Sequence, residues 1–401
     1  MRVGLTDFRW PLDPALAEGR DETTLARALY STPLRTDPAS GAVVPGLCSG
    51  WKSSDGFRRW TFTCRSAPAI AAAVRRVARL PDAPANWIFA QADRVGADAR
   101  TLSIGLRVPW RRFPYALTVV GAAPRTVPGP FDVVSGSRQR VVVRRQGSTV
   151  EFHRVAPREA VREFRQGALD EAAIPVGDVG ATRADPRIGT AVRSRTLLGM
   201  DVALLPPISH GLRVAYRDTA ARGDYEELIP EAAGAGAFGF FGGEKASPAR
   251  FRRAVAAIRT LPRRQVAIDV PPALRAGARI LYGQWRDVGL GPKLVTGSSK
   301  PQASFMRLMS SYPQQEAIPA ELVLRYGLEP RRGLLQALAA TRQQAELKRV
   351  DSALGASARA VPIAWVVDTR LVSPRLQGWR EDALGNVDYT AVRSRGSSKG
   401  P

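Results

Sequence analysis

Apolar and polar residues alternate in two pairs of short segments within the first 155 residues. The first pair, residues 44–51 and 60–64, flanks the turn Ser54-Asp55-Gly56. The second pair, residues 138–145 and 149–155, flanks Gln146-Gly147-Ser148. Two alternating runs around a short turn rich in Gly, Asp and Ser are typical of β-hairpins. The pattern therefore predicts two hairpins, and it indicates two further strands over residues 2–5 and 101–108.

Other segments carry apolar residues at helical spacing, and in the second half of the chain they alternate with short apolar strands. Helices are expected over residues 23–30, 69–80, 159–169, 247–261, 274–288 and 334–354. Strands are expected over residues 265–270, 292–295, 304–309 and 361–367. Ser247 and Pro248 suit the N-cap and first position of their helix. Such alternation predicts an α/β sheet. The polar tail, residues 393–401, is expected to be disordered.

The composition is that of a globular protein with large cores. A length of 401 residues corresponds to two or three domains, and the hydrophobic fraction of 44% is ordinary for a soluble globular protein. The net charge of +23 would attract polyanions. However, only six of the 59 cations are lysines, and the arginines are scattered without a run of five like charges. No specific nucleic-acid partner is therefore expected. No apolar stretch reaches the roughly 18 residues of a transmembrane helix.

Cys48 and Cys64 are the two cysteines of the chain, and they lie on opposite strands of the first predicted hairpin. With the turn centred near Asp55 and Gly56, they fall almost opposite each other, within the reach of a disulfide. We predict that they form one; two buried free thiols are the alternative. A disulfide favours an oxidising compartment.

The chemistry-bearing residues do not form a catalytic or metal-binding pattern. The two histidines, His153 and His210, and the two cysteines are too dispersed for a zinc site. A Gly-x-Gly-x-x-Gly match at residues 234–239 lacks the preceding strand and following helix that a dinucleotide site needs. The sequence therefore predicts a protein without enzymatic activity, cofactor or metal.

A series of short motifs runs in order along nearly the whole chain. They are Leu12-Asp13-Pro14-Ala15, Leu29-Tyr30-Ser31-Thr32-Pro33-Leu34, Val44-Pro45-Gly46-Leu47, Trp60-Thr61-Phe62-Thr63-Cys64-Arg65, Gly129-Pro130-Phe131, Gly167-Ala168-Leu169-Asp170 and the segment 361–379. Together they resemble the signature of the peptide-type (family 5) extracellular solute-binding proteins of ABC transporters. The chain is shorter than the usual family member, and it lacks a segment directly after Arg65.

The resemblance implies an α/β, two-lobed fold of the type II periplasmic-binding-protein class, in the cluster of peptide and nickel binders, with a central ligand cleft. It implies a first lobe formed by residues 1–190 and 356–401 and a second lobe formed by residues 191–355. The expected function is to capture a small solute, peptide-like or other, and to present it to the transmembrane permease subunits. The protein is expected to be an extracytoplasmic monomer, periplasmic or on the cell surface. We expect membrane association only through the permease or a lipid anchor missing from this chain, and a signal sequence trimmed before Met1.

The ligand-binding residues that this resemblance implies are all aromatic or hydroxyl-bearing, the usual composition of a small-molecule site. They are Tyr30, Ser31, Phe131, Ser310, Ser311, Tyr312 and Trp365. Oligopeptide binders of the family carry an aspartate that pairs with the peptide ammonium group, and Ser311 stands at that position here. A hydroxyl cannot neutralise a buried ammonium. We therefore expect that this protein does not hold a peptide by its free α-amino group.

Two other functions remain compatible with the sequence. A sensor or regulatory module could use the same ligand-binding fold, and an upstream DNA-binding or signalling domain would favour it. A polyanion- or envelope-binding protein could use the net charge, and a steep loss of binding with salt would mark it.

Overall fold

The structure of the protein is a computed structural model, which describes residues 1–121, 127–220, 222–228, 236–241, 247–262, 264–297 and 303–395. The chain divides into two compact units, which are described separately. Unit 1 comprises Met1–Arg195, Ser311–Gln314 and Asp368–Pro401, and unit 2 comprises Thr196–Ser310 and Gln315–Val367. No helix of the described ranges is long and apolar enough to cross a membrane. Within the same ranges, no group of three or more His, Cys, Asp or Glu residues is placed to hold a metal ion.

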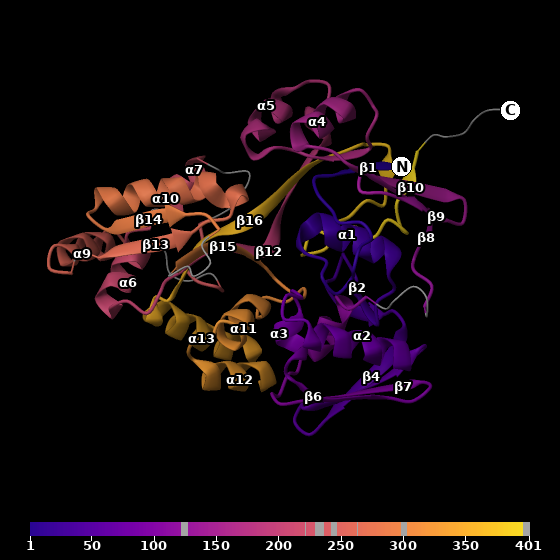
Figure 1. The fold of residues 1–401 in the computed structure, drawn as a ribbon, viewed down its shortest axis with the longest axis horizontal. Coiled ribbons are helices and arrows are strands. Elements are labelled where there is room, and N and C mark those ends of the chain that lie inside the picture. The colour runs from indigo at the N-terminus through magenta and orange to yellow at the C-terminus, as the bar shows by residue number, and fades with distance from the viewer. Residues whose placement is uncertain are drawn as a thin grey trace. The chain divides into compact units, whose positions relative to one another are not determined.

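Unit 1 contains a sheet built around the first strand of the chain (Figure 1). Strand β1 (Arg2–Leu5) pairs in parallel with β10 (Ser148–Arg154) and β11 (Glu171–Ala173). The sheet continues through β9 (Arg140–Arg145) to β8 (Asp132–Gly136), and β11 pairs with the end of β16 (Ala360–Val372). Val3 and Leu5 are fully buried, because β1 has a strand on each side and packs with α1 (Gly19–Leu29).

A second sheet of unit 1 has the strand order β4-β5-β7-β6, and helix α2 (Ala67–Arg79) packs on it. The strands are β4 (Cys48–Ser54), β5 (Arg59–Cys64), β6 (Ala92–Ala97) and β7 (Thr101–Leu106). Alternate residues of β7, Leu102, Ile104 and Leu106, are buried. In the β4–β5 turn Asp55 and Gly56 adopt positive φ, a conformation that these residue types tolerate. Both predicted hairpins are thus present.

The remaining elements of unit 1 are short. They are β2 (Leu34–Thr36), β3 (Val43–Pro45), α3 (Asn86–Phe89), η1 (Phe113–Thr118), α4 (Pro157–Arg165), η2 (Val176–Asp178), α5 (Val179–Ala184), η3 (Gly189–Ala191), β17 (Leu376–Gln377) and β18 (Arg393–Ser394). The pairing of β18 with β17 corrects the expected disorder at the start of the tail. Main-chain hydrogen bonds to residues 376–377 hold residues 393–394 in place; residues 396–401 lie outside the described part.

Unit 2 has a sheet in the order β14-β13-β15-β12, flanked by helices that include α6 and α10 (Figure 1). The strands are β12 (Val192–Leu204), β13 (Gln265–Asp269), β14 (Gly291–Val295) and β15 (Ala303–Met309). The helices are α6 (His210–Asp218), α7 (Arg222–Leu228), α9 (Pro248–Ile258), η4 (Pro272–Leu274), α10 (Arg275–Asp287), α11 (Ala317–Leu324), α12 (Arg331–Ala339) and α13 (Gln343–Ser357). The predicted cap of α9 is present, since Ser247 Oγ accepts a hydrogen bond from the Arg250 N–H at 3.2 Å. The glycine-rich motif at 234–239 lies partly outside the described residues.

One expectation about unit 2, its long C-terminal helix, needs correction. The helix predicted over residues 334–354 is two helices, α12 and α13, because Ala340 adopts an extended conformation with ψ of 144°. The predicted boundary after residue 355 also differs from that of the units, which lies after Val367. The reason is that the first half of β16 carries Val361 and Ile363 into the apolar core of unit 2.

A cluster of buried charges in unit 1 joins the start of α1 to β11, β16 and the C-terminal segment. Arg20 contacts Glu381 at 2.7 Å, Asp368 at 2.8 Å and Glu171 at 3.3 Å. Arg370 contacts Asp368 at 3.0 Å and Glu171 at 3.4 Å. Asp21 also lies 3.0 Å from Arg370, so two guanidinium groups face four carboxylates that are largely removed from water. Charges this deeply buried are tolerated only where opposite charges and hydrogen bonds replace water.

The excess of carboxylates affects Glu381 most. Burial raises the pKa of Glu381 to about 7, and the charge of Asp368 adds to the shift while Arg20 opposes it. Arg20 and Arg370 outweigh the burial of Asp368, and its pKa falls to about 2. One carboxyl of the cluster thus keeps its proton near neutral pH, which reduces the repulsion between the acids.

Cys48 and Cys64 face each other in the register of β4 and β5, and they form a disulfide. Reduction is expected to lower the free energy of unfolding by about 3 kcal/mol, because the bond closes a loop of roughly 15 residues in the unfolded chain. Denaturant unfolding with and without reductant measures the difference, and a C48S/C64S variant, which reductant should not change, is the control. Thiol titration of the denatured, unreduced protein should find no free thiol; two free thiols would disprove the bond.

The protonated state of Glu381 predicts that stability falls as pH rises. The folded protein holds the Glu381 proton more tightly than the unfolded chain, whose carboxyl pKa is near 4.5. The resulting stabilisation is fully present below pH 4.5 and is lost as the pH rises through the folded-state pKa of about 7. Between pH 5 and 8 we expect the free energy of unfolding to fall by roughly 1–3 kcal/mol. E381Q should flatten this slope, whereas the exposed control E18Q should keep it. Equal slopes in all three proteins would contradict the prediction.

Candidate ligand-binding site

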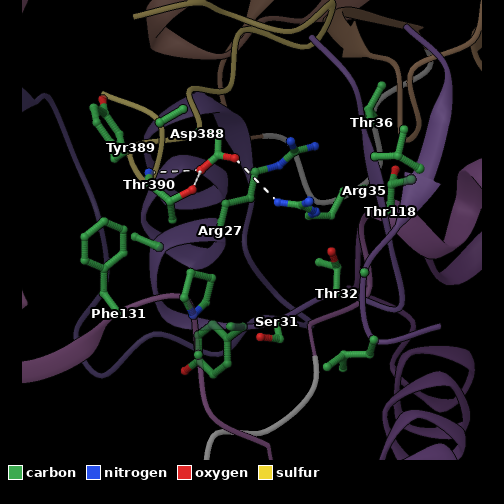
Figure 2. A pocket seen from close by; sticks show the side chains of 18 of the residues that line it. Arg27, Ser31, Thr32, Arg35, Thr36, Thr118, Phe131, Asp388, Tyr389 and Thr390 are labelled. Carbon is green, nitrogen blue, oxygen red and sulfur yellow. Dashed lines mark hydrogen bonds and ion pairs between the residues drawn. The ribbon is translucent and has the colours of Figure 1, made fainter. Parts of the chain in front are cut away.

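A cavity of about 910 Å³ lies in unit 1. Its walls come from the end of α1 and the segment after it, from β2 and β3, from residues 127–131 and from residues 387–391. Figure 2 shows side chains from these segments around the cavity, among them Ser31, Phe131 and Asp388. The volume falls in the range of small-molecule sites, roughly 300–1,000 Å³.

Three of the residues expected to bind ligand line this cavity, and each is held by the main chain. The Tyr30 hydroxyl donates a hydrogen bond to the Leu12 carbonyl. Ser31 Oγ donates to the Pro128 carbonyl at 2.8 Å. Phe131 is 4% exposed, and its N–H donates to the Ala28 carbonyl at 3.1 Å. The motifs around residues 30 and 130 therefore meet at one wall.

Two glycines allow the walls to approach so closely. A Cβ atom on Gly129 would lie 2.1 Å from the Leu29 carbonyl oxygen, and one on Gly46 would lie 2.5 Å from that of Thr32. Both glycines belong to the motifs Gly129-Pro130-Phe131 and Val44-Pro45-Gly46-Leu47. Their role in this structure is close packing of one backbone against another.

The cavity has an excess of positive charge. Its lining includes five arginines, Arg27, Arg35, Arg65, Arg145 and Arg380, and two aspartates, Asp37 and Asp388. None of these residues was predicted from the sequence. Only Arg65 belongs to one of the motifs described above, and the five arginines come from separate segments of the chain. The scatter of arginines along the sequence therefore gives no sign that these five line one cavity.

Two other predicted residues, Ser311 and Tyr312, lie in unit 1 away from the cavity lining. Ser311 Oγ accepts a hydrogen bond from Trp87 Nε1 at 3.1 Å. Tyr312 is fully buried, with ring centroids 6.4 Å from Trp87 and 5.7 Å from Trp110. Its ring packs against the two tryptophans, and it does not line this cavity.

The last two predicted residues belong to unit 2. Ser310 is 5% exposed, and its N–H donates to the Leu198 carbonyl at 2.8 Å. Trp365 is half-buried on β16. Neither lines the cavity of unit 1.

No protein-family model and no curated protein sequence matches the chain. Solved structures do match it over almost the whole length of both chains. The murein tripeptide binding protein MppA of Escherichia coli has a TM-score of 0.77 at 17% identity, and covers 98% of each chain. Haemophilus influenzae OppA in complex with the peptide RPPGFSPFR has a TM-score of 0.78 at 15% identity, with 98% of this chain and 99% of that chain covered.

A nickel-complex binder has a similar fold. Campylobacter jejuni NikZ in complex with Ni(L-His) has a TM-score of 0.75 at 15% identity and covers 96% of each chain. These likenesses confirm the predicted fold class: the chain has the α/β fold of periplasmic binding proteins in the peptide and nickel cluster.

Gly129→Ala tests the close approach at the cavity wall. The added methyl group would overlap the Leu29 carbonyl oxygen, so α1 or residues 127–131 must move. We expect the free energy of unfolding to fall by roughly 1–3 kcal/mol. Gly50→Ala is the matched control, because a Cβ there meets no atom within 4 Å. Denaturant unfolding compares the two variants, and an equal effect of both would contradict the packing described here.

Proposed function

We propose that this protein is the solute-binding component of an ABC import system. The observation that carries the proposal is the fold match over at least 96% of each chain to binding proteins for murein tripeptide, a nonapeptide and a nickel complex. The cavity of unit 1 supports it, since its volume suits a compact solute. Binding would require no chemical step, and the protein would act without a catalytic residue.

In this proposal the two units close on the solute, and the permease recognises the closed form. Strands β12 and β16 each carry residues of both units, so they are the natural hinge. Tyr30, Ser31 and Phe131 contact the solute from unit 1. Ser310, Ser311 and Trp365 remain proposed contacts that closure would complete.

We also propose that the protein works outside the cytoplasm, as a monomer. The Cys48–Cys64 disulfide supports this location, because disulfides persist in oxidising compartments. The comparison structures include proteins described as periplasmic. Peptides, if they are the cargo, would not be held by a free α-amino group, because Ser311 offers a hydroxyl that already accepts a hydrogen bond from Trp87.

Thermal unfolding against a panel of solutes tests the proposed function. The panel contains short peptides, their N-acetylated forms, oligosaccharides, nickel chelates, di- and tricarboxylates, and heparin as a polyanion, each at two salt concentrations. One compact solute class should raise the melting temperature at both salt concentrations. A ligand at about 100 times its dissociation constant stabilises by about 2.7 kcal/mol.

Two results would count against this reading. Stabilisation by heparin alone, lost at the higher salt concentration, would indicate a charged surface and not a transport protein. A strong preference for free over N-acetylated peptides would contradict the expectation at Ser311.

A further inference from the structure

The carboxylates that line the cavity of unit 1 are already engaged within their own loops. Asp37 Oδ1 accepts hydrogen bonds from the N–H groups of Ala39 and Ser40 at 3.0 and 2.6 Å, and from Ser40 Oγ at 2.8 Å. Asp388 Oδ1 accepts from the N–H and Oγ1 of Thr390 at 3.0 and 2.6 Å (Figure 2). These hydrogen bonds leave the negative charge of both aspartates in place, and they fix each carboxylate within its own loop.

Two of the five arginines have acidic neighbours. Arg27 contacts Asp382 at 2.8 Å, and Asp382 is itself 4% exposed, so the Arg27 guanidinium is held in place. Arg35 lies 3.8 Å from Asp388, and its Nε donates to the Pro45 carbonyl at 3.3 Å. Figure 2 shows both side chains on the Asp388 side of the cavity.

The other three arginines, Arg65, Arg145 and Arg380, differ from these. Among the described residues, no carboxylate lies within 4 Å of their guanidinium groups, although all three line the cavity. Asp37 acts on Arg380 only at longer range. The cavity therefore collects positive charge that its own residues do not neutralise.

The main chain around these three arginines is anchored. The Arg65 N–H donates to the Leu47 carbonyl at 2.8 Å, directly after the disulfide at Cys64. Arg145 pairs with Ser148 at the end of the β9–β10 hairpin. Arg380 follows Trp379, whose Nε1 donates to the buried Glu171 at 2.7 Å. The backbone positions from which the three side chains start are therefore fixed at the cavity lining.

We propose that the cavity of unit 1 binds a compact solute with two or more negative charges, carried by carboxylate or phosphate groups. Guanidinium groups pair with both anions through two parallel hydrogen bonds. Tyr30, Phe131 and Tyr389 offer an apolar surface to the body of such a solute. The volume of about 910 Å³ suits a compact solute. That this solute is transported cargo rests on the proposed function, whereas the existence of the anion-binding site does not depend on it.

Calorimetric titration with citrate, pyrophosphate and a diglutamate peptide tests the anion site. A dilysine peptide and a dialanine amide, which carry no net negative charge, are the comparison solutes. We expect at least one anion to bind at least tenfold more tightly than both comparison peptides. Comparing the affinities for citrate and diglutamate with that for pyrophosphate distinguishes recognition of carboxylate groups from recognition of phosphate groups. R65Q, R145Q and R380Q should each weaken that binding about tenfold, which corresponds to about 1.4 kcal/mol.

R252Q is the matched control. It removes the same charge from an exposed position on α9 in unit 2, and should leave anion affinity unchanged within twofold. Thermal unfolding of all four variants verifies that they fold. If R252Q lost as much anion affinity as the cavity variants, the net charge of the protein would explain the binding, and the inference would be wrong.

The two proposals fail separately. If no anion binds but a neutral or cationic solute of the wider panel does, the anion site is wrong and the transport function stands. If anions bind through the three arginines but lobe closure and transport are absent, the anion site stands and the transport function is wrong. If no anion binds and no panel solute binds, both are wrong.

Discussion

The cluster of buried charges around Glu171 determines how unit 1 is assembled. Glu171 is fully buried, contacts Arg20 and Arg370, and accepts hydrogen bonds from Trp379 and from the Tyr389 hydroxyl at 2.8 Å. A carboxylate so deeply buried requires all these partners at once, since an unpaired buried charge costs several kcal/mol. Helix α1, β11, β16 and residues 379–389 are therefore held together, so that the N-terminal helix lies beside the C-terminal segment.

The cavity follows from this arrangement. Its walls are the end of α1 and the C-terminal segment that carries Tyr389, both positioned by the charge cluster. The disulfide and the close approach at Gly129 position the remaining walls. Once these backbones are in place, the arginines that they carry face one cavity. The cavity lining therefore combines five arginines with two aspartates, which gives it an excess of positive charge.

Local sequence patterns predicted much of the fold, but they placed the site only in part. The motifs around residues 30 and 130 led to Tyr30, Ser31 and Phe131, which do line the cavity. The same kind of reasoning included Tyr312, which is buried between tryptophans from distant parts of the chain. The prediction of one helix over residues 334–354 was wrong. No glycine or proline marks its break, and the packing of α12 against α13 decides it.

Local patterns in the sequence were sufficient to predict the hairpins, most helices and the pairing of Cys48 with Cys64, because these depend on alternation, helical spacing and turn residues within about 20 positions. Which charges are buried and which line the cavity depends instead on contacts between distant segments of the folded chain. Arg20 meets Glu381 across 361 positions of the chain. Arg65, Arg145 and Arg380 converge from three separate elements. Such proximity arises from long-range packing, and no local pattern encodes it.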